Sequence, residues 1–340
     1  MVYSFRLNLH GRNNHKMAVF KYYNFQLLPI DTTKYGDVGA EGYQRVFVEI
    51  RKRVDVAKRT RSLQRVAGRL QNDFKFAPFQ VRVLEKFAYG EFLKFDQVEK
   101  VENLYTGDDE FTGNEGSTSK KYDFYFAFDY ERHTLAIQLA RGLPSAGPLI
   151  DALTEIFRPI VDDLHPNHQL HIRELTSADS LVKVFNADRY RRVEVDVTFS
   201  NSEELEEELL RSAGVTEQDL KDNSVHSVTH IEKPAKKGSM TGLSSLAKPL
   251  LVIAANFGNA NVSYATGDGD WEHYHMRDYP VKSEVDPAKD ETHQNFMARV
   301  FSSITLAWRR TRVADEVNEE LKKTKIGAGS DDGDQGLDTL

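Results

Sequence analysis

The sequence predicts an α+β fold in which a mixed or antiparallel sheet is flanked by helices, with a long C-terminal helix. Stretches whose apolar residues alternate, as in half-buried strands, are interspersed with stretches of helical period. Hydrophobic residues make up 40% and aromatic residues 11% of the 340 residues, which is enough for a packed core. No segment repeats with a period of about 20 to 50 residues, which argues against a repeat architecture.

The first half of the chain is expected to combine strands with one basic helical region. Strands are predicted from alternating or aromatic-rich sequence at 19–28, 76–95, 122–128 and 134–139. For 76–95, a buried helix is the alternative. Residues 41–72 keep helical spacing without proline, which favours one or two helices. The last two strands predict a hairpin with Phe124, Phe126 and Phe128 on one face.

In the second half, helices and strands are expected to alternate. Helices are predicted at 148–162, 179–186, within 203–221 and at 289–323. Strands are predicted at 169–175, 190–199, 224–232, 249–258, 262–265 and 271–279. The apolar run 249–258 is interpreted as a buried strand because of its length and its β-branched residues.

Shifts in composition divide the chain into five parts. These are an N-terminal extension at 1–16, an N-terminal α/β sub-domain with the basic helix at 17–106, a glycine-rich linker loop at 107–120, a C-terminal α+β domain at 121–325 and a disordered tail at 326–340.

Charge and cysteine content exclude several classes of function. The formal net charge is -7, so any site for a polyanion must be local. The chain has no cysteine, which excludes a disulfide framework, a thiolate zinc site, a cysteine nucleophile and a cysteine-held iron–sulfur cluster. The sequence shows no signal-peptide core and no apolar run of about 18 residues, so we expect a cytoplasmic protein that does not enter a membrane.

The strongest charge feature lies in the first helical region. Spaced at about 3.6 residues per turn, Lys58, Arg61, Arg65 and Arg69 are expected to share one helical face, where their charged groups could meet successive phosphates. The alternative is a solvated helix face that pairs with acidic segments such as EELEEE at 203–208.

Two further groups of cations are candidate phosphate contacts. Lys233, Lys236 and Lys237 precede glycines in a segment that also contains proline, which predicts a basic loop able to bring backbone N–H groups close to an anion. Arg309 and Arg310 follow Trp308 in the closing helix, where they can equally cap the helix end.

The sequence contains no catalytic motif that matches a known chemistry. It has neither a G-x-x-x-x-G-K-[ST] phosphate loop nor a G-x-S-x-G nucleophile elbow. His273 and His275 fall on the same face of a predicted strand, and three more histidines cluster at 165–171, but no third ligand stands at a defined spacing. We therefore expect no metal, no cofactor and no catalytic residues.

The order of elements from Tyr122 to Arg312 resembles that of the RexA phage-exclusion family and related bacterial phage-defence proteins. The resemblance rests on FYFAFDYERHTLAIQ, RRVEVDVTFSNSEELEEELLRSAG, the basic KPAKKG segment, PLLVIAANFGNANVSYATGDG and the closing helix. It implies a dimeric, sequence-independent DNA-binding protein of a defence response, and only the segment of Lys233, Lys236 and Lys237 occupies a comparable place.

Taken together, these features predict a non-enzymatic protein that binds double-stranded DNA through its phosphates and acts as a homodimer in phage exclusion, with a possible protein partner from a defence operon. Two other hypotheses stay open. A divergent metal-dependent nuclease requires carboxylates and histidines in one cleft, and a protein-interaction module requires a broad exposed apolar patch.

Overall fold

The computed structural model of the chain describes residues 17–31, 34–114, 116–198, 223, 225–236, 238–288 and 291–311. The expected N-terminal extension, the expected helices within 203–221, Lys237 and the expected tail at 326–340 lie outside these residues. The chain forms two compact units. Unit 1 comprises residues 1–175 and 280–309, and unit 2 comprises residues 176–279 and 310–340.

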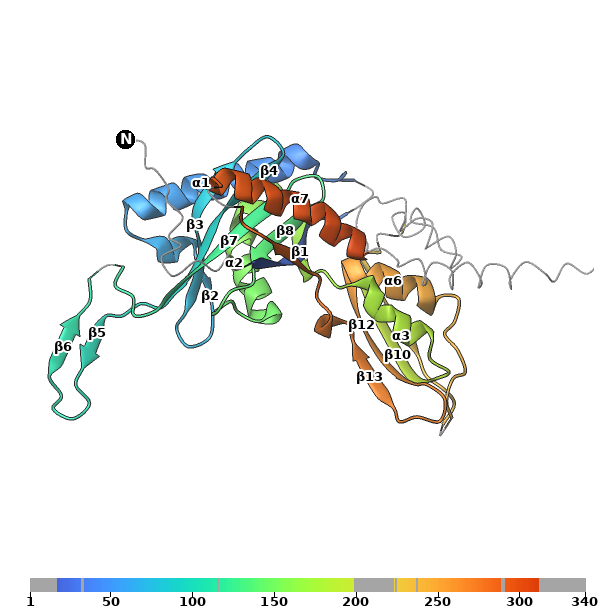
Figure 1. Cartoon of the computed structure of the whole chain (residues 1–340). Coiled ribbons are helices and arrows are strands. Elements are labelled where there is room, and N and C mark those ends of the chain that lie inside the picture. Colours follow the sequence, from blue (N-terminus) through green and yellow to red (C-terminus); the bar gives the residue numbers. More distant parts are fainter. Residues whose placement is uncertain are drawn as a thin grey trace, which may run out of the picture. The chain divides into compact units, whose positions relative to one another are not determined.

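Unit 1 is built on an eight-stranded sheet in which every pair of neighbouring strands is antiparallel (Figure 1). The order is β14-β1-β8-β7-β4-β3-β2, and β9 also pairs with β1. The strands are β1 (Ala18–Pro29), β2 (Gly68–Arg69), β3 (Lys75–Val83), β4 (Phe87–Phe95), β7 (Lys121–Asp129), β8 (Thr134–Gln138), β9 (His168–Glu174) and β14 (Lys282–Val285).

Helices cover both faces of this sheet. α1 (Ala40–Arg59) and α2 (Ala146–Leu164) pack on one face and α7 (His293–Thr311) on the other. Because side chains alternate along a strand, Phe20 and Tyr22 of β1 enter the core under α7, whereas Tyr23 and Phe25 enter the core under α1 and α2. The near-continuous apolar sequence of β1 follows from burial on both faces.

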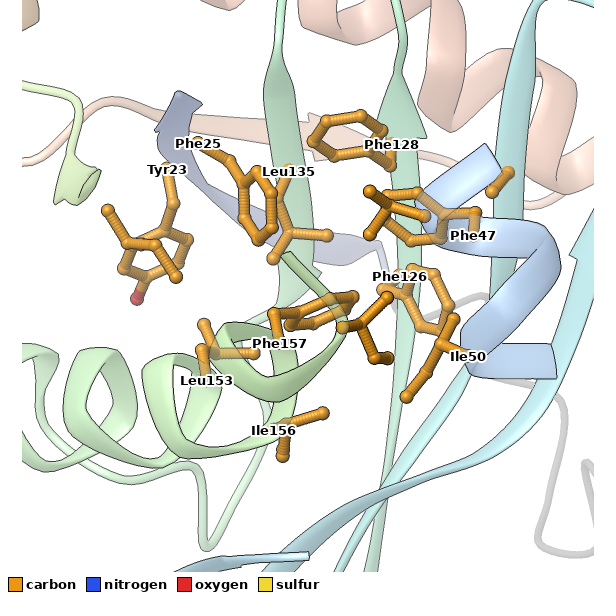
Figure 2. Close-up of a cluster of buried hydrophobic side chains, with 14 of the residues drawn as sticks. Tyr23, Phe25, Phe47, Ile50, Phe126, Phe128, Leu135, Leu153, Ile156 and Phe157 are labelled. Atoms are coloured by element: carbon orange, nitrogen blue, oxygen red, sulfur yellow. The ribbon is translucent and has the colours of Figure 1, made fainter. Parts of the chain in front are cut away.

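The larger core of unit 1 is rich in aromatic rings (Figure 2). Phe47 of α1 stacks on Phe128 of β7 with ring centroids 4.5 Å apart, and Phe157 of α2 meets Phe25 edge to face at 5.0 Å. Phe124, Phe126 and Phe128 all lie in this core, so the predicted hairpin of β7 and β8 is confirmed together with its apolar face.

Unit 2 contains a four-stranded antiparallel sheet of order β11-β10-β12-β13. Its strands are β10 (Arg189–Thr198), β11 (Ser227–Glu232), β12 (Gly258–Ala265) and β13 (Glu272–His275). One face is covered by α6 (Ala247–Phe257) and by the short α3 (Val182–Phe185), which follows the 3-10 turn η2 (Ala178–Leu181). A second 3-10 turn, η3 (Met276–Asp278), follows β13.

The composition shift at 107–120 falls at an exposed hairpin. The strands on either side of it, β4 and β7, pair with each other over their full length in the sheet of unit 1. Between them, β5 (Lys100–Glu102) and β6 (Asp109–Thr112) form a separate two-stranded ribbon. The compact units divide at residues 175/176, 279/280 and 309/310 instead.

The expectation of a buried strand at 249–258 is wrong, because most of that run forms helix α6. Every residue from Pro249 to Phe257 is buried. A helix enclosed on all sides is apolar on all sides, so its sequence shows no helical period, and a short apolar run cannot then be told from a strand. Leu250, Leu251, Ala254 and Ala255 are good helix formers, and Pro249 lies in the first turn, where its missing N–H costs little.

The helical region expected at 41–72 ends earlier, at Arg59. The 3-10 turn η1 (Leu63–Val66) and β2 follow. Of the helix expected at 289–323, the structure describes α7 over His293–Thr311, and the residues beyond Thr311 lie outside the described part. The expectation of an α+β fold with an antiparallel sheet and flanking helices is confirmed. None of the described helices is long and apolar enough to span a membrane.

Candidate nucleic-acid interface

The sheet of unit 2 has one apolar and one polar face. Val193, Val195 and Val197 of β10 are buried in the core beneath α6. Because neighbouring side chains along a strand point to opposite faces, the residues between them belong to the other face, on which no helix of the described residues packs. The same alternation buries Val262 and Tyr264 of β12 and leaves polar residues between and beside them.

On this polar face, cross-strand neighbours form two rows. Arg192 of β10 pairs with Ser263 of β12, which pairs with His273 of β13. In the next row, Glu194 pairs with Asn261, which pairs with His275.

Side-chain contacts fix the positions of several of these groups. The Arg192 guanidinium donates to Glu194 Oε2 over 2.6 Å, and His275 Nδ1 lies 2.8 Å from Asn261 Oδ1. The two histidine rings stand nearly parallel with centroids 6.4 Å apart.

A β-bulge adds a further cation to the polar face. The register of β10 against β12 shifts between Tyr190 and Arg192, so Arg191 is the extra residue. Such a bulge changes the direction of a side chain without ending the strand. The Arg191 guanidinium lies over the Trp271 ring at 4.2 Å from its centroid, and the Arg189 guanidinium lies 5.6 Å from the same centroid.

The predicted basic loop follows β11 at the edge of this face. Lys233 and Lys236 are exposed, and neither forms an ion pair with any residue in the described part of the chain. Gly238 N–H donates to the Ala235 carbonyl over 2.9 Å and closes a turn. Regular strand structure has therefore ended before the lysines.

The base of the loop is tied at both ends. Met240 and Tyr190 exchange two backbone hydrogen bonds of 2.8 Å. The Ser244 hydroxyl donates to the carboxylate of Glu232, which His230 also contacts at 2.8 Å. Burial acts to raise the pKa of Glu232, but these hydrogen bonds outweigh it and lower that pKa. An ionised Glu232 thus anchors the start of the loop to its far end.

Sheet and loop together line an open cavity of about 740 Å³. Its cationic members are Arg191, Arg192, Lys233 and Lys236, and His273 and His275 line it as well. Ser263, which is only 9% exposed, also lines it, and its hydroxyl oxygen is buried without a hydrogen-bond partner in the described structure. A buried hydroxyl without a partner is costly, so the floor of the cavity offers an unused hydrogen-bonding group. We call this cavity and its lining the cationic face.

The structure does not bring the four predicted helix cations onto one helical face, so that expectation is wrong. Lys58 lies at the end of α1, Arg61 in the turn after it, Arg65 in η1 and Arg69 in β2. The helix ends because the chain turns into the left-handed region at Arg61 (φ 51°), which the spacing of apolar residues cannot reveal. Of the four, Lys58 and Arg61 line a cavity of unit 1 to which Arg65 and Arg69 do not contribute.

The other predicted cations have mixed outcomes. Lys233 and Lys236 line the cationic face, whereas Lys237 lies outside the described residues. Arg309 and Arg310 are exposed in the last turn of α7, and the division between the two units falls between them. Neither contributes to the cationic face.

Histidines do not form a metal cluster in the described part of the chain. No group of three or more histidine, aspartate or glutamate side chains there could hold a metal ion. His165 and His168 lie with ring centroids 5.9 Å apart after α2, and His168 Nε2 lies 2.9 Å from the Gly36 carbonyl.

Sequence reasoning missed Arg191 and Arg192 as members of the site. The available signal was the run RYRR at 189–192, which places three cations at the start of a predicted strand. Sequence reasoning also considered His273 and His275 as metal ligands and not as neighbours of the basic loop. The pairing of β11, β10, β12 and β13 is what brings the loop of Lys233 and Lys236 next to them, and the sequence does not show this pairing.

Comparison with known proteins gives a family and no function. A family model described as a domain of unknown function (DUF4747) matches residues 21–304. No curated protein matches the chain.

Proposed function

We propose that this chain, which belongs to the DUF4747 family, binds the phosphate backbone of double-stranded DNA on the cationic face of unit 2, without reading the base sequence. The observation that carries the proposal is the convergence of Arg191, Arg192, Lys233 and Lys236 around one open cavity. In the sequence, the pair of arginines precedes the pair of lysines by about 40 residues.

The chemistry of this face suits phosphates. Lysine and arginine neutralise phosphate oxygens and release condensed counterions, which provides most of the energy of nonspecific DNA binding. Arg192 is held by Glu194 and Arg191 by Trp271, while the two lysines are free of ion pairs with the described residues. Such an array offers both fixed and adaptable contacts to a polyanion.

The same face explains how a chain of net charge -7 can approach DNA. Association depends on the local potential of the contact surface more than on the total charge. The cross-strand rows of the sheet present short polar groups such as Ser263 and Asn261. On this face, no helix of the described residues is available to enter a groove of the DNA and read its bases. Backbone contacts position a protein on DNA without carrying sequence information.

The biological setting of the proposal rests on the resemblance in element order to the RexA family. By that resemblance, we propose that the protein is a non-enzymatic, cytoplasmic component of a bacterial or phage-encoded exclusion system. The resemblance equally supports action as a homodimer, with a protein partner from the same defence operon.

A salt titration of DNA binding tests the proposal. Replacing Lys233 and Lys236 by alanine is expected to weaken binding to unrelated duplexes to the same extent. The slope of log affinity against log salt should fall by about 0.9 for each phosphate that the variant no longer neutralises. Fluorescence anisotropy of labelled duplexes between low and physiological salt measures both effects.

The matched control is Lys183→Ala, which removes an exposed lysine from α3 on the helical side of the same unit. It should leave affinity and slope unchanged. An identical salt slope in the wild type and the Lys233→Ala/Lys236→Ala variant, or equal losses of affinity in the control, would contradict the proposed interface.

A further inference from the structure

Unit 1 contains a cavity of its own, of about 410 Å³, which the proposed function does not use. It lies where the end of α1, strands β3 and β4 and the segment 116–121 meet. Its volume falls within the range of about 300 to 1,000 Å³ that is typical of small-molecule sites. We call it the α1 pocket.

The floor of the α1 pocket is apolar. Phe79 of β3, Leu93 and Phe95 of β4, and Ala57 and Leu63 provide it. Phe79 and Phe95 are half-buried, so part of their surface stays open to a ligand. Flat aromatic ligands gain most from such surfaces, because they bury a large area at little cost in conformational entropy.

Three cations stand around this floor. Lys58 Nζ lies 4.2 Å and Lys121 Nζ 5.8 Å from the centroid of the Phe79 ring, and Arg61 lines the same cavity. Lys58 and Arg61 form no ion pair with a described residue, while Lys121 forms an exposed pair with Asp123 at 3.0 Å. The pocket therefore joins an apolar floor to three cations, of which Lys121 is paired with Asp123, and the charges of Lys58 and Lys121 also act on the carboxylate of Glu91.

Arg61 has a backbone conformation that is unfavourable for a residue with a large side chain. Ser62 N–H bonds the Ala57 carbonyl over 2.8 Å and Arg61 N–H bonds the Lys58 carbonyl over 3.3 Å, which is the Schellman pattern of helix ends. In that pattern the residue with positive φ is usually glycine, and here it is Arg61 with φ 51°. A large side chain at such a position has a cost, and observed strain of this kind clusters at functional sites.

Among the described residues that line the pocket, the one carboxylate is already satisfied. Asp96 accepts hydrogen bonds from the Thr118 hydroxyl (2.6 Å), the Ser119 hydroxyl and N–H, and the Lys120 N–H (3.0 Å). Burial acts to raise the pKa of Asp96, but these bonds outweigh it and hold that pKa well below its usual range. Asp96 thus shapes the segment 117–120 and does not pair with the three cations.

We propose that the α1 pocket binds a mononucleotide, with its base on the floor of Phe79, Leu93 and Phe95 and its phosphate among Lys58, Arg61 and Lys121. The apolar floor alone would suit any flat ring, and the cations alone would suit any anion. Their combination selects a ring that carries a phosphate. Gln64 and Gln97 at the rim supply amide groups that can contact the edge of a base.

Calorimetric titration of the full-length protein with adenosine 5′-monophosphate tests the proposal. Adenosine and inorganic phosphate, each alone, form the comparison arms. The nucleotide should bind with one site per chain and at least about tenfold more tightly than either part, because the ring and the phosphate each contribute.

Arg61→Gly is the sharpest variant, because the fold and the site respond in opposite directions. Glycine relieves the backbone at this helix end, so the melting temperature should stay unchanged or rise. Removal of the charged group should weaken nucleotide binding by roughly 10- to 100-fold. Lys58→Gln is expected to weaken binding in the same direction and serves as a second variant if Arg61→Gly alters the fold.

The matched control is Arg59→Ala, which removes an exposed cation from the same turn that does not line the pocket. It should not change nucleotide affinity, and neither should the Lys233→Ala/Lys236→Ala variant of unit 2. Three results would overturn the proposal. These are no binding of the nucleotide at millimolar concentration, inorganic phosphate binding as tightly as the nucleotide, or unaltered affinity in both Arg61→Gly and Lys58→Gln.

Discussion

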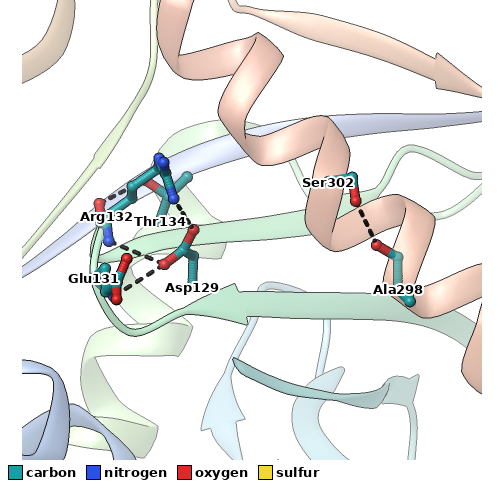
Figure 3. A network of polar contacts seen from close by, with 6 residues as sticks. All are labelled: Asp129, Glu131, Arg132, Thr134, Ala298 and Ser302. Carbon is teal, nitrogen blue, oxygen red and sulfur yellow. Dashed lines mark hydrogen bonds and ion pairs between the residues drawn. The ribbon is translucent and has the colours of Figure 1, made fainter. Parts of the chain in front are cut away.

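At the scale of single residues, the turn between β7 and β8 joins a polar network to the core of unit 1 (Figure 3). Asp129, which is buried, accepts hydrogen bonds from the N–H groups of Glu131 and Arg132 over 2.9 and 3.0 Å and from the Arg132 guanidinium over 3.0 Å. In the same turn, His133 has a positive φ of 49°. Its ring stacks on the Tyr43 ring, with centroids 4.2 Å apart. Burial lowers the pKa of His133 to about 4, against the opposing charge of Asp129.

The pKa of His133 predicts a loss of stability in acid. An unfolded histidine titrates near pH 6.5, so below that pH the unfolded chain takes up a proton that folded His133 accepts only near pH 4. The stabilisation from neutral His133 is present above pH 6.5 and is lost as the pH falls toward 4, by about 3 kcal/mol in all. Burial also lowers the pKa of His165 and His293, which adds to the loss.

Urea unfolding at several pH values between 4 and 7 measures the share of His133. Asparagine tolerates positive φ and does not titrate, so in His133→Asn the free energy of unfolding should fall less between pH 7 and pH 4 than in the wild type. The control is His273→Asn, an exposed histidine of unit 2. Parallel pH profiles of the wild type and His133→Asn would disprove this assignment.

At the scale of elements, α7 is held by one apolar stripe. Phe296, Met297, Val300, Ile304 and Ala307 are buried at helical spacing against β1, β4, β7 and β8. The Phe301 ring stacks on Phe87 with centroids 4.4 Å apart. In the middle of the stripe, the Ser303 hydroxyl lies 2.7 Å from the Tyr22 hydroxyl. α7 therefore covers the face of the sheet opposite to the one on which α1 and α2 pack.

Shortening a buried and an exposed side chain of α7 to alanine should have unequal effects on the free energy of unfolding. Ile304 is fully buried, so Ile304→Ala is expected to lower the free energy of unfolding of unit 1 by about 2 to 5 kcal/mol through reduced burial and the cavity left behind. Leu306, two residues away, is 57% exposed, and Leu306→Ala should change it by less than about 0.5 kcal/mol. Denaturant titration of both variants tests the docking, and similar losses of stability would show that α7 packs differently.

At the scale of the whole molecule, residues 176–279 are an insertion into unit 1. The Val281 N–H bonds the Leu175 carbonyl over 2.8 Å, so the chain leaves unit 1 and returns to it at adjacent points. Two residues farther out, the Ser177 N–H bonds the Tyr279 carbonyl over 3.0 Å. The buried cluster of unit 2 consists entirely of residues from 181 to 276, so each unit has its own core.

Separate cores predict that unit 1 survives removal of the insertion. Unit 1 should still unfold cooperatively on heating, and the nucleotide affinity of the α1 pocket should be unchanged, after residues 176–279 are replaced by a short glycine–serine linker. The reason is that the ends to be joined are already hydrogen-bonded neighbours. The same deletion should abolish DNA binding. A deletion protein that fails to unfold cooperatively would show that unit 1 depends on the insertion.

Much of the local structure followed from sequence patterns. The hairpin of β7 and β8 and helix α2 were predictable because each shows its period on one clear face. The strand interpretation of 76–95 is confirmed by β3 and β4, but its partial alternation had left a buried helix open as the alternative. The end of α1 was not, because Arg61 takes a conformation that glycine usually signals. Helix α6 was not, because a helix buried on all sides has no polar face to mark its period.

The sequence by itself determined the fold class, the absence of cysteine chemistry and the cationic character of the loop at Lys233 and Lys236. Only the tertiary structure decided which cations act together. Antiparallel pairing of β11, β10, β12 and β13 brings that loop next to Arg191, Arg192 and His273, while the turn at Arg61 separates Lys58 from Arg65 and Arg69. Strand pairing and chain reversal are set by long-range packing, and the spacing of residues along the chain records only local periods.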